Sequence, residues 1–261
     1  MINLIKMDLR RLFLSKVFFI TMSITALLNI VILSVIPLVT KMFMPDAETQ
    51  AVQLSSVLTN PFVIGWMIIL MFVSVVSYSY ADMANGYIKN IAGQIPRRSD
   101  TILSKFVVIG VHNLIFIAVA ALSVVLGQVI GSSFGTYTIA FDAQVPGGIL
   151  TLVLKWLLSM AVCSILLFFT TAVRNKTLAA IVGVIFGTNT LGLVYGGLNF
   201  AVSQAFHTQS FDLGMYMPDS LLQSVNAVQN IGVLNSVIAS AVCIALFLIL
   251  TVRVFNARDI K

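Results

Sequence analysis

The sequence predicts an all-α, polytopic integral membrane protein with six transmembrane helices and both termini on the cytoplasmic side. Of the 261 residues, 59% are hydrophobic and only 9% are charged. A soluble domain carries roughly a quarter charged residues. The mean hydropathy of +1.04 and repeated apolar segments of about 20 residues, the length that a bilayer span needs, complete the case.

Six segments are long and apolar enough to be spans. They lie at 17–40, 61–81, 102–130, 150–173, 177–200 and 232–254, within a transmembrane domain of 17–254 that a short tail, 255–261, follows. The first has no small-residue cleavage site beyond it, so we expect a retained helix and no signal peptide. The third is longer than a bilayer requires, and we expect its start near Lys105 to project into the cytoplasm. Arg174, Asn175 and Lys176 predict a tight hairpin between the fourth and fifth.

The basic residues set the predicted orientation, because Lys and Arg near span ends stay on the cytoplasmic side. With the N-terminus inside, only Lys41 and Lys155 of the fifteen Lys and Arg fall in outer segments. The outer segments hold most of the acidic residues, which are Asp46, Glu48, Asp142, Asp212 and Asp219. Topology and contact with anionic lipid therefore explain the pI of about 9.5, and we expect no nucleic-acid partner.

No pattern typical of an enzyme or a metal site occurs. There is no Gly-rich phosphate loop, no carboxylate pair at catalytic spacing and no His cluster, and Cys163 and Cys243 fall inside predicted spans. We therefore expect no catalytic residue, no metal and no cofactor in this chain. An intramembrane His can be functional, but for His112 we favour a hydrogen bond to Asn113 or to a neighbouring helix. The predicted span centres lack Asp, Glu, Lys and Arg, which disfavours proton-coupled transport and voltage sensing.

Residues 1–16 predict an amphipathic helix that lies in the membrane interface. One side carries the apolar residues Ile2, Ile5, Leu9, Leu12 and Phe13. The other side carries the polar residues Asn3, Asp8, Arg10, Arg11 and Ser15, and Lys6 adds a further positive charge. A simple positively charged anchor for the first span is the alternative.

The inner loop at 82–100 predicts a second amphipathic helix. Apolar residues recur at helical spacing at Met83, Tyr87, Ile88, Ile91 and Ile95, whereas Asn85, Lys89 and Asn90 face away. Pro96 stops the run, Arg97 and Arg98 follow it, and Ser99 or Asp100 can cap the next helix. Tyr and Ile beside basic residues indicate a docking surface for another protein. A connector that lies along the membrane is the alternative.

In this loop, and in its overall layout, the sequence resembles the membrane (permease) subunits of type 2 class ABC exporters. The order Asp82, Asn85-Gly86, an apolar and basic helix, Arg98-Ser99 and Lys105 is similar to the family's, although Glu and Thr are commoner there than Asp82 and Asn85. The resemblance implies a coupling helix that docks in a cleft of an ATPase subunit. The residues that it assigns to coupling are Asp82, Asn85, Gly86, Tyr87, Ile88, Asn90, Ile91, Arg97 and Arg98.

Two further regions fit a dimeric permease. Gly183 and Gly187, then Gly192 and Gly196, are spaced by four residues, which allows close helix packing either between subunits or within one. In the outer segment, 201–231, Pro218, Asp219 and Ser220 precede Leu221, Leu222, Val225 and Val228. We expect a short capped helix there, on or in the outer leaflet, like the family's outer re-entrant elements.

The resemblance thus implies a permease that pairs with a second permease, identical or homologous, and with two ATPase subunits that bind ATP and Mg. In the bacterial cytoplasmic membrane it would export an amphipathic or hydrophobic substrate, for which we favour a peptide such as a bacteriocin or cytolytic peptide. Lipid or hydrophobic-drug export, including an immunity transporter, is an alternative. A membrane anchor or sensor without transport is an alternative of another class, and an intramembrane enzyme is third.

Overall fold

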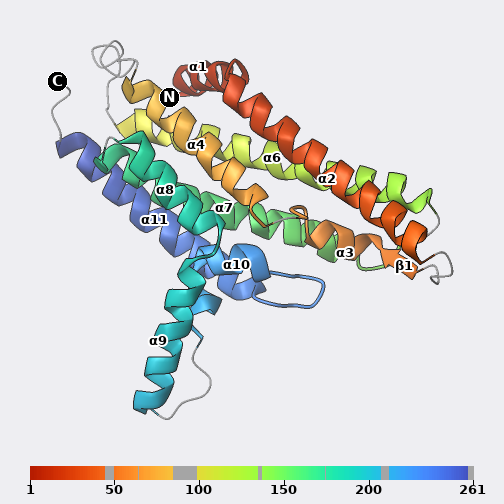
Figure 1. Ribbon diagram of the computed structural model, residues 1–261. Coiled ribbons are helices and arrows are strands. Elements are labelled where there is room, and N and C mark those ends of the chain that lie inside the picture. Colours follow the sequence, from red (N-terminus) through yellow and green to blue (C-terminus); the bar gives the residue numbers. More distant parts are fainter. Residues whose placement is uncertain are drawn as a thin grey trace.

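The computed structural model describes residues 1–44, 50–63, 65–84, 99–134, 137–173, 175–206 and 212–257. These residues form an elongated helical bundle from which one helix, α9, projects (Figure 1). The helices are α1 (Ile2–Phe13), α2 (Lys16–Phe43), α3 (Leu54–Thr59), α4 (Met67–Ala84), α6 (Ser99–Ser132), α7 (Val145–Val173), α8 (Lys176–Gly187), α9 (Leu191–Phe206), η1 (Leu213–Tyr216), α10 (Pro218–Ser224) and α11 (Val233–Ala257). The all-α prediction for a membrane protein is confirmed.

The transmembrane helices follow the predicted spans in part. Within the described residues, four helices, α2, α6, α7 and α11, are long and apolar enough to cross a bilayer. The other two predicted spans are not single long helices. The span predicted at 61–81 is α4, which begins only at Met67, and the span predicted at 177–200 is broken into α8 and α9, which are bent by 60° to each other.

Helices α4 and α8, which take the place of parts of the second and fifth predicted spans, pack side by side. At 1.5 Å per residue, the 12 residues of α8 reach about 18 Å, short of the roughly 30 Å of a hydrocarbon core. A Cβ on Gly187 would lie 3.1 Å from the Cα of Ile69, so the last turn of α8 touches the first turn of α4. The bend at 188–190 then directs α9 away from the bundle (Figure 1).

A buried amide holds α2 against α6. Asn29 Nδ2 lies 2.9 Å from Ser123 Oγ, 3.1 Å from the Pro61 carbonyl oxygen and 3.3 Å from that of Ala120. Glycines allow the same two helices to approach, since a Cβ on Gly131 would lie 2.6 Å from the Leu33 carbonyl oxygen. In a bilayer the hydrophobic effect does not drive helices together, so membrane helices associate through close backbone contacts of this kind.

The hairpin predicted around Asn175 is confirmed. Helix α7 ends at Val173 and α8 begins at Lys176, and the Asn175 side chain accepts hydrogen bonds from the amides of Thr177 and Leu178 at 2.9 and 3.3 Å. Asn is a favoured N-cap because its side-chain oxygen satisfies amides that have no partner within the helix. A polar residue between two apolar runs therefore fixes where the chain reverses.

A small parallel sheet was not predicted. Strand β1 (Gln50–Gln53) pairs with β2 (Tyr137–Ala140), with Gln50 opposite Tyr137 and Gln53 opposite Ala140. The loop after β2 is tied to α3 through Asp142, whose carboxylate accepts from the Ser55 hydroxyl at 2.6 Å and from the Ser55 amide at 3.1 Å. These hydrogen bonds lower the pKa of Asp142, although desolvation acts in the opposite direction.

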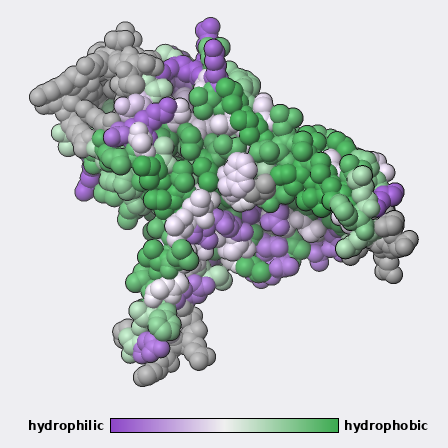
Figure 2. Space-filling view, in the orientation of Figure 1, coloured by the Kyte–Doolittle hydropathy of each residue, from purple (hydrophilic) through white to green (hydrophobic). Residues whose placement is uncertain are grey.

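The bundle has two ends that the chain marks differently. The start of α1 and the end of α11 lie at one end, here termed the α1 end, and β1 lies at the opposite end, the β1 end (Figure 1). Hydrophobic side chains cover most of the visible face between them, and hydrophilic ones gather near α1 and below the bundle beside α10 (Figure 2). Many large apolar side chains of α2, α7 and α11 are exposed, as expected of helices that contact lipid.

The α2–α6 crossing should be sensitive to one added methyl group. We expect Gly131→Ala to lower the free energy of unfolding by about 1–3 kcal/mol, because the methyl group meets backbone that cannot move aside. The control is Gly197→Ala on α9, where nothing lies within 4 Å of the added atom. Unfolding of both variants in micelles by increasing SDS measures this difference, and equal midpoints would contradict the crossing.

Candidate functional site

Helix α1 lies across one end of the bundle and packs on α6. Leu12 is buried, and Ile5 and Leu9 pack against the core, so the amphipathic helix predicted at 1–16 is confirmed as a helix with one apolar face toward the protein. Lys6 and Arg10 are exposed. The apolar face is not wholly covered, because Ile2 and Phe13 remain exposed, which suits contact with a membrane interface.

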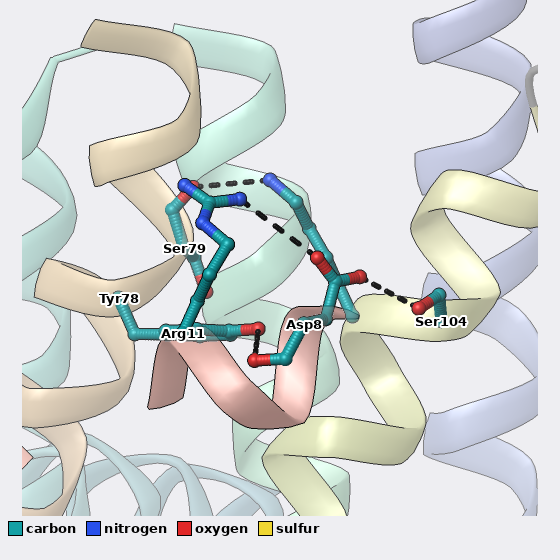
Figure 3. Close-up of polar contacts among 6 residues, drawn as sticks. Asp8, Arg11, Tyr78, Ser79 and Ser104 are labelled. Carbon is teal, nitrogen blue, oxygen red and sulfur yellow. Dashed lines mark hydrogen bonds and ion pairs between the residues drawn. The ribbon is translucent and has the colours of Figure 1, made fainter. Parts of the chain in front are cut away.

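Asp8 is the polar residue on the buried face of α1, with only 1% of its surface exposed. Its Oδ2 accepts a hydrogen bond of 2.6 Å from the Ser104 hydroxyl of α6, and Arg11 Nη1 lies 3.8 Å from its Oδ1. The Tyr78 hydroxyl of α4 donates to the Asp8 carbonyl oxygen at 3.3 Å. Figure 3 shows these side chains converging from α1, α4 and α6. Our prediction that Asp8 lies on the solvent side of α1 was therefore wrong.

Lys105 is a buried cation of the same region. Its Nζ donates to the Ser79 carbonyl oxygen of α4 at 3.3 Å, and only 1% of its surface is exposed. Lys105 is thus buried within the protein, and the expectation that this part of α6 projects beyond the bilayer into the cytoplasm stays a prediction. We call this group of contacts the α1 anchor. Its members are Asp8, Arg11, Tyr78, Ser79, Ser104 and Lys105.

The α1 anchor joins three helix ends in one place. It contains residues from the last turns of α4 and the first turns of α6, which are the helices on either side of residues 85–98. Buried charges of this kind persist only when they are paired and hydrogen-bonded, and removing one partner of such a set is strongly destabilising. The arrangement can therefore hold α1, α4 and α6 as one unit at this end of the bundle.

The residues that the resemblance assigns to coupling cannot be placed. Asn85, Gly86, Tyr87, Ile88, Asn90, Ile91, Arg97 and Arg98 lie outside the described residues. Asp82 is in the last turn of α4, but its side chain is outside the described part. Their roles stay predictions, and the structure places only the two helix ends that flank them.

The four glycines selected for helix packing fall into two groups. Gly183 and Gly187 of α8 pack on α4 and α7, with Phe72, Leu166 and Ile69 as neighbours, so they serve packing within the chain. Gly192 faces the Asn189 side chain, and Gly196 has no described atom within 4 Å of an added Cβ. Of the four glycines, only Gly192 and Gly196 of α9 therefore remain candidates for a contact between two subunits, and that contact stays a prediction.

His112 lies in a chain of neutral hydrogen bonds in the middle of the bundle. Its Nε2 is 3.0 Å from Ser74 Oγ on α4, and its Nδ1 is 3.0 Å from Asn113 Oδ1. Asn113 Nδ2 then donates to Ser159 Oγ at 3.1 Å and approaches Cys163 Sγ at 3.2 Å on α7. The preferred interpretation of His112, a hydrogen bond to Asn113 and to a neighbouring helix, is confirmed.

Two charged residues assigned to outer segments are buried. Lys155 lies within α7, where 4% of its surface is exposed, and donates to the Leu222 carbonyl oxygen of α10 at 2.9 Å. Asp219 of α10 accepts from the Tyr195 hydroxyl at 3.1 Å. Burial raises the pKa of Asp219, although the hydrogen bond from Tyr195 opposes that shift. Both residues are buried because α7 begins at Val145, earlier than expected, and α10 packs against it. Their assignment to the outer side of the membrane stays a prediction.

The short helix predicted in the outer segment is confirmed, but its setting differs. Helix α10 begins with Pro218 and buries Leu221 and Leu222 against α7. The residue before it, Met217, makes no side-chain capping bond, so the predicted cap was wrong. Val225 is also buried. This helix therefore belongs to the packed bundle.

The described residues hold no group of three or more His, Cys, Asp or Glu side chains that could bind a metal ion. Comparison of the sequence with protein-family models gave no match, and the curated proteins gave no significant match either. The function must therefore be argued from the arrangement itself.

Removal of the Asp8 carboxylate should release α1 from the bundle. We expect Asp8→Ala to speed amide hydrogen exchange in residues 2–13 by at least about tenfold, because a lost charged hydrogen bond costs about 1.5–3 kcal/mol. Lys6→Ala, which changes an exposed side chain on the same helix, is the matched control. Exchange measured by mass spectrometry in lipid nanodiscs distinguishes them, and slow exchange in both variants would show that α1 does not depend on Asp8.

Proposed function

We propose that the chain is the permease subunit of a type 2 class ABC exporter in the bacterial cytoplasmic membrane, with the α1 end facing the cytoplasm. It would pair with a second permease, as a homodimer or heterodimer, and with two ATPase subunits that bind ATP and Mg. The basic residues support this orientation, since Lys6, Arg10, Lys16, Lys176 and Arg253 all lie on segments near the α1 end.

The α1 anchor is the observation that carries the proposal. An ATPase that pushes on residues 85–98 would act on the ends of α4 and α6, which are joined to each other and to α1 by buried hydrogen bonds. Closely packed, hydrogen-bonded groups deform little. A force on residues 85–98 would therefore move α1, α4 and α6 together. A loop that only connects two helices does not require an anchor beside it.

The polar groups buried in the bundle are bonded to one another and offer a substrate few charges. Within the described spans, Asn29, His112 and Asn113 bond to neighbouring helices. The buried cation of α7, Lys155, donates to the Leu222 carbonyl oxygen of α10. Few available charges suit an amphipathic or hydrophobic substrate. We propose a peptide, such as a bacteriocin or cytolytic peptide, with lipids and hydrophobic drugs as second choices.

Tyr87→Ala combined with Ile91→Ala tests the coupling role directly. Truncation of buried aromatic anchors commonly costs about 2 kcal/mol or more, whereas charges at an interface rim cost much less. We expect the double variant to lose co-purification with the cognate ATPase, or substrate-stimulated ATP hydrolysis in lipid, and to keep its helical content.

Arg97→Ala is the matched control in the same loop, and it should cause only a mild, salt-sensitive defect. Normal ATPase binding and transport in the double variant would contradict the proposal. That outcome would favour the other class of function, a membrane anchor or sensor without transport.

A further inference from the structure

A cavity of about 430 Å³ lies beside α9, between that helix, η1 and the start of α10. Its size falls within the roughly 300–1,000 Å³ of sites that hold small ligands. The bend between α8 and α9 opens it, and it is distinct from the α1 anchor. We call it the α9 cavity. Its polar lining includes Asn189, Tyr195, Asn199, Asp212 and Ser220.

Asp212 gives the α9 cavity a carboxylate with one oxygen available. Asn199 Nδ2 and the Gly214 amide both donate to its Oδ1, each at 2.9 Å. Among the described residues, none donates to its Oδ2. Asp212 is exposed, so its charge faces the cavity mouth, whereas the Asp219 carboxylate already accepts from Tyr195.

Ser220 places a second oxygen beside Asp212. A Cβ on Gly214 would lie 3.0 Å from Ser220 Oγ and 3.2 Å from Asp212 Oδ1, so both oxygens border the space that this glycine leaves open. A glycine at this position therefore keeps room between two hydrogen-bond acceptors.

Asn189 supplies a third acceptor. It has a φ of 53°, a left-handed conformation that Asn adopts more readily than most residues. Its side chain lies over Gly192, and its buried Oδ1 accepts no hydrogen bond within the described part of the chain. A buried acceptor without a donor costs about 1–3 kcal/mol, and rotation of this side chain toward a donor bound in the cavity would recover that cost.

The acceptors favour an organic cation over a metal ion. Calcium needs six to eight oxygen ligands, and one carboxylate with two neutral oxygens falls short of that. No basic side chain is among the described residues that line the cavity. A primary ammonium carries three donors and one positive charge, which matches one carboxylate and two neutral acceptors. Leu193 of the same lining is largely exposed and offers an apolar surface next to them.

We propose that the α9 cavity binds the primary ammonium group of an amphipathic molecule, with acceptors on Asp212, Asn189 and Ser220 and apolar contact from Leu193. The ammonium can come from a peptide amine or from the amine of a lipid headgroup. This binding does not require an ATPase. The test of the cavity and the test of the proposed function can therefore fail independently of each other.

The test uses the full chain in phosphatidylcholine nanodiscs, which carry no primary amine. Titration with octylammonium, followed by calorimetry, should show saturable binding to one site, whereas octanol, which has the same apolar chain, should show none. Asp212→Asn keeps an oxygen for Asn199 and Gly214 but removes the charge. It should weaken octylammonium binding by at least about tenfold.

Two further variants separate the site from general surface charge. Asn189→Gly removes the third acceptor in a residue type that tolerates a positive φ, and Gly214→Ala fills the space beside Ser220; each should also weaken binding. Asp142→Asn, which removes a carboxylate at a site bonded to Ser55, is the matched control and should leave affinity unchanged. Thermal unfolding without ligand checks that every variant is folded.

Equal affinities in Asp212→Asn and Asp142→Asn, or equal binding of octanol, would overturn the proposal. A parallel titration in nanodiscs that contain phosphatidylethanolamine distinguishes the two sources of the ammonium. Weaker octylammonium binding there would identify the lipid headgroup as a competing ligand, and unchanged binding would assign the cavity to a peptide or other soluble amine.

Discussion

The hydrogen bond between Asp8 and Ser104 is the interaction on which the α1 end of the bundle depends. It places a carboxylate of the amphipathic helix α1 2.6 Å from a hydroxyl of the long apolar helix α6. A carboxylate removed from water in this way must be compensated by its surroundings, and here Arg11 lies 3.8 Å from its other oxygen. Tyr78 adds a hydrogen bond to the main-chain carbonyl oxygen of the same residue. Since the donors come from α4 and α6, the position of α1 is determined by the same helices that lie on either side of residues 85–98 in the sequence.

The rest of the bundle uses the same principle with uncharged groups. Asn29 joins α2 to α6, and the chain from Ser74 through His112 to Ser159 joins α4, α6 and α7. Interhelical hydrogen bonds in a membrane contribute about 0.6 kcal/mol each on average, so these contacts specify which helices are neighbours more than they add stability. Lys155 of α7 and Tyr195 of α9 hold α10 from two sides.

Composition and apolar length were sufficient to predict a helical membrane protein, the amphipathic α1, the turn at Asn175 and the four long spans. The break at 188–190 was not predictable from hydropathy, because α8 and α9 are both apolar and no Pro separates them. The parallel pairing of β1 with β2 depends on contacts across more than 80 residues, which no local pattern reports.

The candidate site was less predictable than the fold, because charged residues were expected on the polar side of each helix from their charge alone. Asp8 lies three residues after Ile5 and four before Leu12, which are both on the packed side of α1. That spacing places all three residues on one face of the helix. The helical period alone was therefore enough to predict that Asp8 lies on the packed face. Lys155 follows the same rule with Leu158 of α7. The partners of both residues lie far away in the sequence, and only the packing of the helices identifies them.

The distance between α1 and α6 in a working complex tests the account most directly. Spin labels at Lys6, which is exposed on α1, and at Val107, which is exposed on α6, report that distance by electron paramagnetic resonance in lipid nanodiscs. If the α1 anchor joins these helices, the distance distribution is narrow and the same with the ATPase bound to ATP or to ADP. A broad distribution, or a shift between the two nucleotide states, would contradict the claim that α1, α4 and α6 move as one unit.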